Sequence, residues 1–266
     1  MKRLLAALAV AVISLLSVAV STALGHGNYA RGSWDDGWYE RHEWDRPSGA
    51  MKCNGMLTHV TIRNHVEVPP DGVCTLIDSA VNGAVHVRDG GYFQATSTSV
   101  LGDVEASEAL TVFIDGGSRI GGSVTANETA QVSLFDSTIA GRIGIYRSHD
   151  TVNVCGTTVK GAGIGIARSR SDILVGDPLA VGCAGNRVTR GSVLLWKNSV
   201  DVAFVVRGNR IPRGRLHVVG NKGPSDKFVQ KNTARKGIRC TGNLAPFAGS
   251  PNFGPVTGRG QCGPNL

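Results

Sequence analysis

Residues 118–143 read SRIGGSVTANETAQVSLFDSTIAGRI, and this stretch decides the predicted fold. It holds two copies of a hydrophobic-x-Gly-x-hydrophobic unit, one starting at Ile120 and the other at Ile139. Between the copies, apolar and polar residues alternate through 131–135, a pattern typical of a half-buried β-strand. A strand and a glycine turn that recur at a fixed period indicate a repeat protein in which each repeat forms one coil.

The same unit recurs along most of the chain. Its first residue lies at Val81, Val100, Ile120, Ile139, Val159, Val188 and Ile211, at steps of 19, 20, 19, 20, 29 and 23 residues. Two positions earlier lies a small polar residue: Ser79, Thr98, Ser118, Ser137, Thr157, Asn186 and Asn209. Stacked coils would hold such side chains about 4.8 Å apart, so a Ser/Thr ladder is expected to pass into an Asn ladder.

These columns predict an all-β, single-domain parallel β-helix (β-solenoid) with rungs of about 19–23 residues. A β-sandwich also has short strands, but its strands do not repeat one side-chain column at constant spacing. Alternating strands with inward apolar residues are expected at 110–114, 131–135 and 151–154. The 29-residue step predicts a bulging loop before Val188, within a stretch that contains 169–172 and 176–178.

The N-terminus has the pattern of a signal peptide over residues 1–25. Two basic residues precede an apolar run at 4–20, and small residues follow, so cleavage after Ala23 or Gly25 fits equally well. A permanent membrane anchor would need about 20 strongly apolar residues and a polar flank. The sequence therefore predicts a secreted or cell-surface protein whose mature chain has no transmembrane helix.

Residues 26–50 have neither alternation nor helical periodicity, and they are rich in tryptophan and acidic residues. We expect a flexible lead-in before a solenoid domain at 51–266. Trp34, Trp38 and Trp44 could stack on sugar rings, or they could cover the open first coil, because a solenoid needs its end coils capped.

Six cysteines in an exported chain predict three disulfides, and nothing in their spacing resembles a metal-binding CxxC pair. The cysteines are Cys53, Cys74, Cys155, Cys183, Cys240 and Cys262. Consecutive members are separated by 21, 28 and 22 residues within the three successive pairs, close to one coil each. We therefore expect sequential pairing, with the outer two bridges fastening the ends of the solenoid.

Charge divides the chain into two halves. Residues 51–159 carry 6 Lys and Arg against 11 Asp and Glu, a net of −5, whereas 160–266 carry 17 against 4, a net of +13. A basic half can attract acidic envelope polymers, and a dipolar rod can associate head to tail. The alternative is that Lys and Arg only keep a strand-rich surface soluble and its edges protected.

A resemblance rests on VPPDGVCTL at 68–76, on the gapless V-x-G-x-V rungs, and on IRCTGN at 238–243 with a final cysteine at 262. In these features the chain resembles the secreted parallel β-helix proteins of actinobacteria, over residues 53–262. That resemblance implies export and fold, and it carries no active site. A looser similarity is to bactofilin-type polymer-forming proteins, which are cytoplasmic and lack the signal peptide and these cysteines.

No motif for a protease, esterase, nucleotide-binding loop or EF-hand is found in the sequence. Stacking would place His86 beside Glu105 on the next coil, with Arg88 and Asp103 in neighbouring outward columns. Paired carboxylates suit glycoside hydrolysis, and carboxylates with a basic residue suit Ca²⁺-assisted elimination from a uronic acid. Opposite charges on adjacent strands also occur simply because they are mildly stabilising.

The sequence thus favours an exported, non-enzymatic solenoid that provides a structural or interaction surface at the cell envelope or outside the cell. Its expected partners are acidic envelope polymers, bound through the basic C-terminal half, and a second copy in head-to-tail association. No cofactor, metal or specific nucleic acid is expected. The alternative is a β-helix polysaccharide lyase or glycoside hydrolase that uses His86, Arg88, Asp103 and Glu105.

Overall fold

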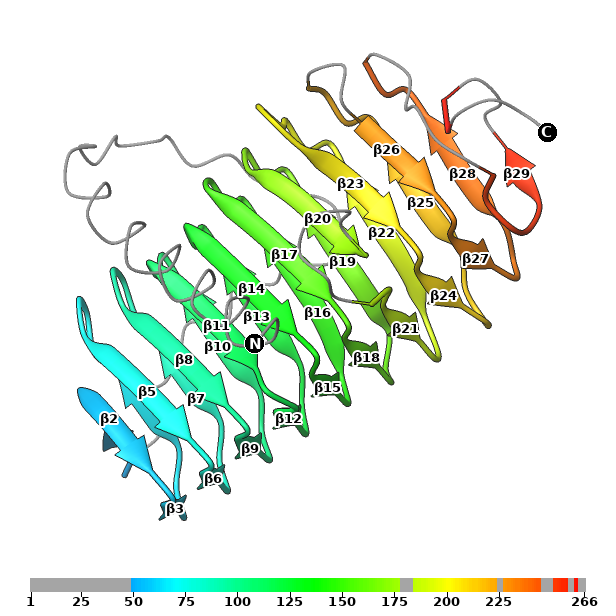
Figure 1. The fold of residues 1–266 in the computed structure, drawn as a ribbon. Helices are drawn as coiled ribbons and strands as arrows, with labels where there is room; N and C mark the ends of the chain where they lie inside the picture. Colours follow the sequence, from blue (N-terminus) through cyan, green and yellow to red (C-terminus); the bar gives the residue numbers. More distant parts are fainter. Residues whose placement is uncertain (1–48, 178–183, 224–226, 245–250, 258–260, 263–266) are drawn as a thin grey trace, which may run out of the picture. The chain divides into compact units, whose positions relative to one another are not determined.

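The computed structural model describes residues 49–177, 184–223, 227–244, 251–257 and 261–262, and the fold is a parallel β-solenoid (Figure 1). Each coil contributes one strand to each of three parallel sheets, and the strands of about nine coils stack along one axis. The predicted fold class is therefore confirmed. The predicted signal peptide and lead-in lie outside the described residues.

The three sheets are named here in the order in which a coil meets them. The first sheet contains β1 (Met51–Lys52), β4 (Val66–Val68), β7 (Val85–Val87), β10 (Val104–Ser107), β13 (Val124–Asn127), β16 (Arg142–Tyr146), β19 (Gly163–Ala167), β22 (Ser192–Trp196), β25 (Leu216–Val219), β28 (Ile238–Thr241) and β29 (Val256–Thr257). The second contains β2 (Gly55–Thr58), β5 (Val73–Ile77), β8 (Tyr92–Thr96), β11 (Thr111–Asp115), β14 (Gln131–Phe135), β17 (Thr151–Cys155), β20 (Asp172–Gly176), β23 (Phe204–Arg207) and β26 (Lys227–Gln230). The third contains β3 (Thr61–Ile62), β6 (Ala80–Val81), β9 (Ser99–Val100), β12 (Arg119–Ile120), β15 (Thr138–Ile139), β18 (Thr158–Val159), β21 (Arg187–Val188), β24 (Arg210–Ile211) and β27 (Thr233–Ala234).

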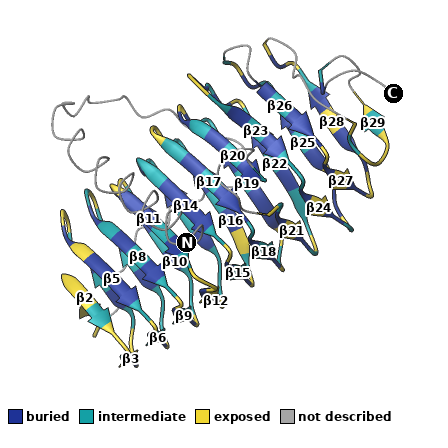
Figure 2. Ribbon diagram, in the orientation of Figure 1, coloured by how far each residue is buried: buried dark blue, intermediate teal, exposed yellow. Residues whose placement is uncertain are grey.

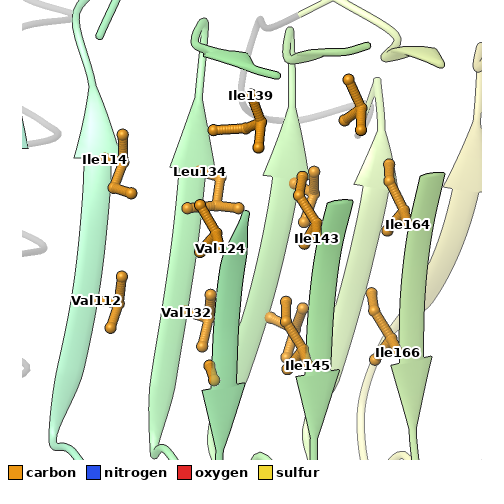
Figure 3. Close-up of a cluster of buried hydrophobic side chains, with 14 of the residues drawn as sticks. Val112, Ile114, Val124, Val132, Leu134, Ile139, Ile143, Ile145, Ile164 and Ile166 are labelled. Carbon is orange, nitrogen blue, oxygen red and sulfur yellow. The ribbon is translucent and has the colours of Figure 1, made fainter. Parts of the chain in front are cut away.

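Inward residues of all three sheets form one continuous core (Figure 2). The seven repeat positions from Val81 to Ile211 are buried and form one column of the third sheet, as predicted. Ile62 and Ala234 extend that column by one coil at each end. Figure 3 shows buried side chains of the second sheet, on β11 and β14, and of the first sheet, on β13, β16 and β19, with Val124 beside Leu134. Each fully buried Val, Leu or Ile contributes about 1.5–3 kcal/mol.

The predicted strands at 110–114, 131–135 and 151–154 correspond to β11, β14 and β17, but three of their apolar residues, Leu110, Phe113 and Phe135, do not point inward as predicted. Leu110 does not point inward: it precedes β11 and is 39% exposed. The alternation that buries Val112 and Ile114 turns the residues between them outward. Phe113 therefore lies on the outer face, where its ring contacts that of Phe135 at 5.6 Å between centroids.

Two buried polar ladders run along the axis. The predicted ladder from Ser79 to Asn209 lies where the second sheet turns into the third, and it continues through Asn232 to Asn252. A second ladder, which the sequence reading missed, lies where the first sheet turns into the second. Its members are Thr129, Ser148, Ser169, Asn198, Asn221 and Asn243.

A residue with positive φ precedes each of these second-ladder members and turns the chain through the corner. The values are 52° at Glu128, 54° at Arg147, 56° at Arg168, 52° at Lys197, 65° at Gly220 and 64° at Gly242. The side chain of each positive-φ residue other than glycine points away from the core, whereas the ladder residue that follows it points inward. The corner therefore carries an outward row of side chains at Glu128, Arg147, Arg168 and Lys197, and glycine takes the equivalent position at 220 and 242.

Disulfides fasten both ends of the solenoid, as expected from the sequence. Cys53 is bonded to Cys74 with a Cα–Cα distance of 5.4 Å, and Cys240 is bonded to Cys262 with a Cα–Cα distance of 5.7 Å. Cys155 is also disulfide-bonded. Its predicted partner, Cys183, lies outside the described residues, so that pairing stays a prediction.

The extra residues of the 29-residue step lie between β20 and β21, where residues 178–183 fall outside the description. Of residues 169–172, the other stretch named for the bulge, 169–171 instead belong to the ordinary corner between β19 and β20, and Asp172 begins β20. Ser169 is a buried member of the second ladder there. Over the described residues, no helix is long and apolar enough to cross a membrane.

Candidate functional site

The four residues considered for catalysis lie on the first sheet near the N-terminal end. His86 and Glu105 are in register on β7 and β10, and His86 Nδ1 lies 3.0 Å from a carboxylate oxygen of Glu105. Arg88 pairs with a different acid, Glu67, at 3.5 Å. The predicted adjacency of His86 and Glu105 is thus present in the structure, while Arg88 is directed toward the preceding coil.

Asp103 has a local structural partner. Its carboxylate accepts a hydrogen bond of 2.5 Å from the backbone N–H of Ser123 on the next coil. The imidazole of His86 also stacks on that of His65, with 5.9 Å between ring centroids. These side chains therefore pair with residues of neighbouring coils on the outer face of the sheet. Such pairing between adjacent strands is mildly stabilising by itself.

A hollow of about 350 Å³ lies at the first coil, and none of the four residues lines it. Its lining includes Met51, Leu57, Val60 and Ile62, so it is the apolar end of the core. Met56 beside it is 67% exposed. The carboxylates of Glu105 and Asp103 are thus both engaged in contacts between neighbouring coils.

The basic half of the chain forms a ridge along the third sheet and the corner that leads from it into the first sheet. We define the basic ridge as the exposed residues Lys160, Arg187, Arg190, Arg210, Arg213, Arg215, Arg235 and Lys236. The four stretches that supply them, 156–163, 186–192, 209–216 and 232–239, contain no Asp or Glu. The ridge is therefore a run of one sign of charge.

Like charges face each other directly within the basic ridge. Arg187 of β21 and Arg210 of β24 are register partners on adjacent strands. Such like-charged pairs destabilise a sheet. Near the ridge, burial and the guanidinium groups of Arg215 and Arg239 lower the pKa of His217. The positive field thus extends from the ridge onto the first sheet.

A second cationic feature lies at the opposite edge of the first sheet, on the corner row described above. We define the cation–aromatic row as Arg147, Arg168 and Lys197 together with Tyr146 and Trp196. Cationic groups of the row lie over the rings: the Arg168 guanidinium carbon is 4.8 Å from the Trp196 ring centroid, and Lys197 Nζ is 4.4 Å from it. The Arg147 guanidinium carbon lies 5.1 Å from the Tyr146 ring centroid.

The row is anchored at one end by an acid. Arg147 donates a hydrogen bond of 2.7 Å to Glu128, and this bond raises the pKa of Arg147. Arg168 donates to the Tyr146 hydroxyl at 3.3 Å. The row was not predicted from the sequence. Arg168 and Lys197 are 29 residues apart, and they occupy equivalent positions on adjacent coils only because the extra residues of that coil lie in the loop after β20.

Comparisons with known proteins identify no relative: no family model, no curated protein and no solved structure matches the chain. The resemblance to secreted actinobacterial β-helix proteins and to bactofilins therefore has support in its fold component alone, the parallel β-solenoid. The disulfides are typical of proteins in an oxidising, extracellular environment.

Proposed function

We propose that the protein is an exported, non-enzymatic β-solenoid that binds an acidic polymer of the cell envelope through the basic ridge. The observation that carries the proposal is the register pair of Arg187 and Arg210. Two guanidinium groups held opposite each other repel, and an anion bound between them removes that repulsion. Disulfide stapling of both ends suits a rigid surface that works outside the cell.

Repetition along the axis also supports a polymer as the ligand. Each coil from β18 to β27 supplies one or more ridge residues at this edge, and the strand backbones of consecutive coils lie about 4.8 Å apart. A polymer with regularly spaced negative charges can contact several of them at once, and multivalency multiplies weak contacts. A small anion would gain only one or two of these contacts.

The experiment measures binding of the purified protein to polygalacturonate over a range of salt concentrations, with neutral dextran as the control polymer. We expect affinity at low salt that falls steeply as salt rises, because bound counterions are released. Arg210→Gln should reduce the salt slope by about 1. Arg119→Gln is the matched control, since Arg119 is exposed in the same outer column of the third sheet but lies in the acidic half.

Two outcomes would overturn the proposal. One is the absence of polygalacturonate binding at low salt. The other is an equal change of slope in Arg210→Gln and Arg119→Gln, which would mean that net charge, and not the ridge, governs the attraction.

A further inference from the structure

The cation–aromatic row is a binding site in its own right, distinct from the basic ridge. We infer that Arg147, Arg168 and Lys197 bind a linear polyuronate, a polysaccharide with a carboxylate on each sugar, lying along the solenoid axis. This inference goes beyond the proposed function, because it assigns a second site and names its ligand class. It concerns a different edge of the first sheet, so the two can be tested separately.

Register places the three cations in one line. Tyr146, Ala167 and Trp196 are partners on β16, β19 and β22, and each is followed directly by a member of the row. The Cα atoms of consecutive members therefore lie about one strand spacing apart, about 4.8 Å. A polymer whose charges recur once per sugar ring presents its carboxylates at a comparable interval along a parallel line.

Contacts within the row hold the cationic groups in place before any ligand binds. Arg168 lies over the Trp196 ring and also donates to the Tyr146 hydroxyl, while Lys197 lies over the same Trp196 ring. Cation–π contacts of this kind restrict long, flexible side chains. Binding then costs less side-chain entropy than it would at freely moving surface lysines and arginines.

The strand beside the row leaves room for a sugar ring. The outward residues of β19 are Gly163, Gly165 and Ala167. Gly163 is required by the backbone, because its φ is +114° and a Cβ there would lie 2.0 Å from the Ser192 carbonyl oxygen. Gly165 is not required, since a Cβ there would meet only the Ile143 carbonyl oxygen, at 4.0 Å. Glycine at such a strand position often marks close approach of a ligand.

The same geometry disfavours single-stranded nucleic acid as the ligand. Base stacking needs an aromatic face that a base can cover. The Trp196 ring already has two cationic groups within 4.8 Å of its centroid. Arginine and carboxylate, by contrast, form paired, charge-assisted hydrogen bonds that need no ring. The row thus suits carboxylates held on a flat, polar chain.

The test uses a defined oligogalacturonate, its carboxyl-reduced neutral counterpart, polyphosphate and single-stranded DNA, each measured by titration calorimetry. Arg168→Gln should weaken oligogalacturonate binding about tenfold, the loss of one charge-assisted hydrogen bond. Arg170→Gln is the matched control, because it removes one exposed positive charge two residues away. It should leave the affinity nearly unchanged.

Gly165→Leu distinguishes binding at a site of defined shape from non-specific electrostatic attraction, because the substitution changes the surface beside the row but not the charge. A leucine side chain there covers the surface beside the row, and a strand tolerates leucine better than glycine. We expect loss of oligogalacturonate binding with an unchanged thermal unfolding midpoint. The inference is overturned if Gly165→Leu binds normally, if Arg168→Gln and Arg170→Gln weaken binding equally, or if polyphosphate or DNA binds as tightly and depends equally on Arg168.

The ridge variant keeps the two hypotheses distinguishable. If Arg210→Gln lowers the salt slope while Arg168→Gln and Gly165→Leu have no effect, the row inference fails and the proposed function stands. If only the row variants lose binding, the ridge proposal fails and the row remains the binding site.

Discussion

The two halves of the first ladder satisfy the same buried corner with different chemistry. In the N-terminal half, the single hydroxyl hydrogen of Ser118 is shared between the backbone carbonyls of Asp115, at 2.6 Å, and Ala95, at 3.2 Å, and the hydroxyl oxygen accepts from the N–H of Thr98. In the C-terminal half, Asn209 donates to Asn232 at 2.9 Å and accepts from Asn186 at 3.0 Å. A hydroxyl has one donor and an amide has two, so only the amides also link side chain to side chain.

Charge differs between the same two halves. The N-terminal coils pair opposite charges across coils, as in His86 with Glu105 and Arg147 with Glu128. The C-terminal coils place Arg187 against Arg210. The coils whose ladder residues are hydrogen-bonded side chain to side chain are thus the same coils in which Arg187 faces Arg210 on the outer surface. A solenoid can therefore carry a binding surface of one charge when its interior ladder is cross-linked by amides.

The largest effect on stability is expected from Asn209→Ala. The change removes the Asn186–Asn209 and Asn209–Asn232 bonds and a bond of 2.9 Å to the Val175 carbonyl, all buried. Because the buried groups of Asn186, Asn232 and Val175 then lose hydrogen bonds, we expect the free energy of unfolding to fall by about 3 kcal/mol. Urea denaturation followed by circular dichroism measures it. A loss below that of Ser137→Ala would contradict the comparison.

Asn209→Ser sharpens the same point, because it converts one amide position to the chemistry of the N-terminal half. A hydroxyl can still bond to the backbone, but it cannot hold both neighbouring amides. We expect a loss of about 2 kcal/mol, between those of the alanine variant and the hydroxyl deletion below. Stability equal to that of the parent in the same denaturation experiment would show that the amide links contribute nothing.

Ser137→Ala should have a smaller effect. Ser137 is buried and donates at 2.6 Å to the Phe135 carbonyl two residues earlier. Deleting one such hydroxyl should cost about 1 kcal/mol. The same urea experiment provides the value, and a loss as large as that of Asn209→Ala would mean that the two halves are equally dependent on their ladders.

The smallest expected effect is a pH dependence confined to the basic half. The pKa of His217 is lowered in the folded state by burial and by Arg215 and Arg239. The unfolded chain therefore binds this proton more readily, and stability should fall as pH drops below the unfolded value of about 6.5. His217→Gln should flatten that part of the profile. A parent and variant with identical profiles between neutral and mildly acidic pH would refute this attribution.

Sequence reasoning reached the fold because each coil repeats a glycine turn and an inward aliphatic residue. It missed Ile62, which is followed by Arg-Asn-His without glycine, and Ala234, a small residue at a position that the recognised coils fill with Val or Ile. The second ladder was missed for another reason. Its members follow charged residues such as Glu128 and Arg168, and a polar pair at a strand end looks like any surface turn until positive φ turns one of them inward.

The candidate sites were predicted less completely than the fold, because the contacts within a site depend on the direction in which each side chain points. Stacking of His86 on Glu105 followed directly from the repeat. The orientation of Arg88 toward Glu67, and the use of Asp103 as a backbone acceptor, depend on rotamers that no spacing encodes. The cation–aromatic row required the register across an irregular coil, where the repeat signal was weakest.

The terminal disulfides have a mechanical consequence. Tension applied to the chain at residue 49 passes from Cys53 through its bond to Cys74, so it bypasses β2, β3 and β4. Tension on the other end passes from Cys262 to Cys240 and bypasses β29. The strands enclosed by the two disulfides therefore bear no load, and at the N-terminal end only β1, which precedes Cys53, can be peeled off first. Beyond β1, unravelling under tension has to start in coils that are held by neighbours on both sides.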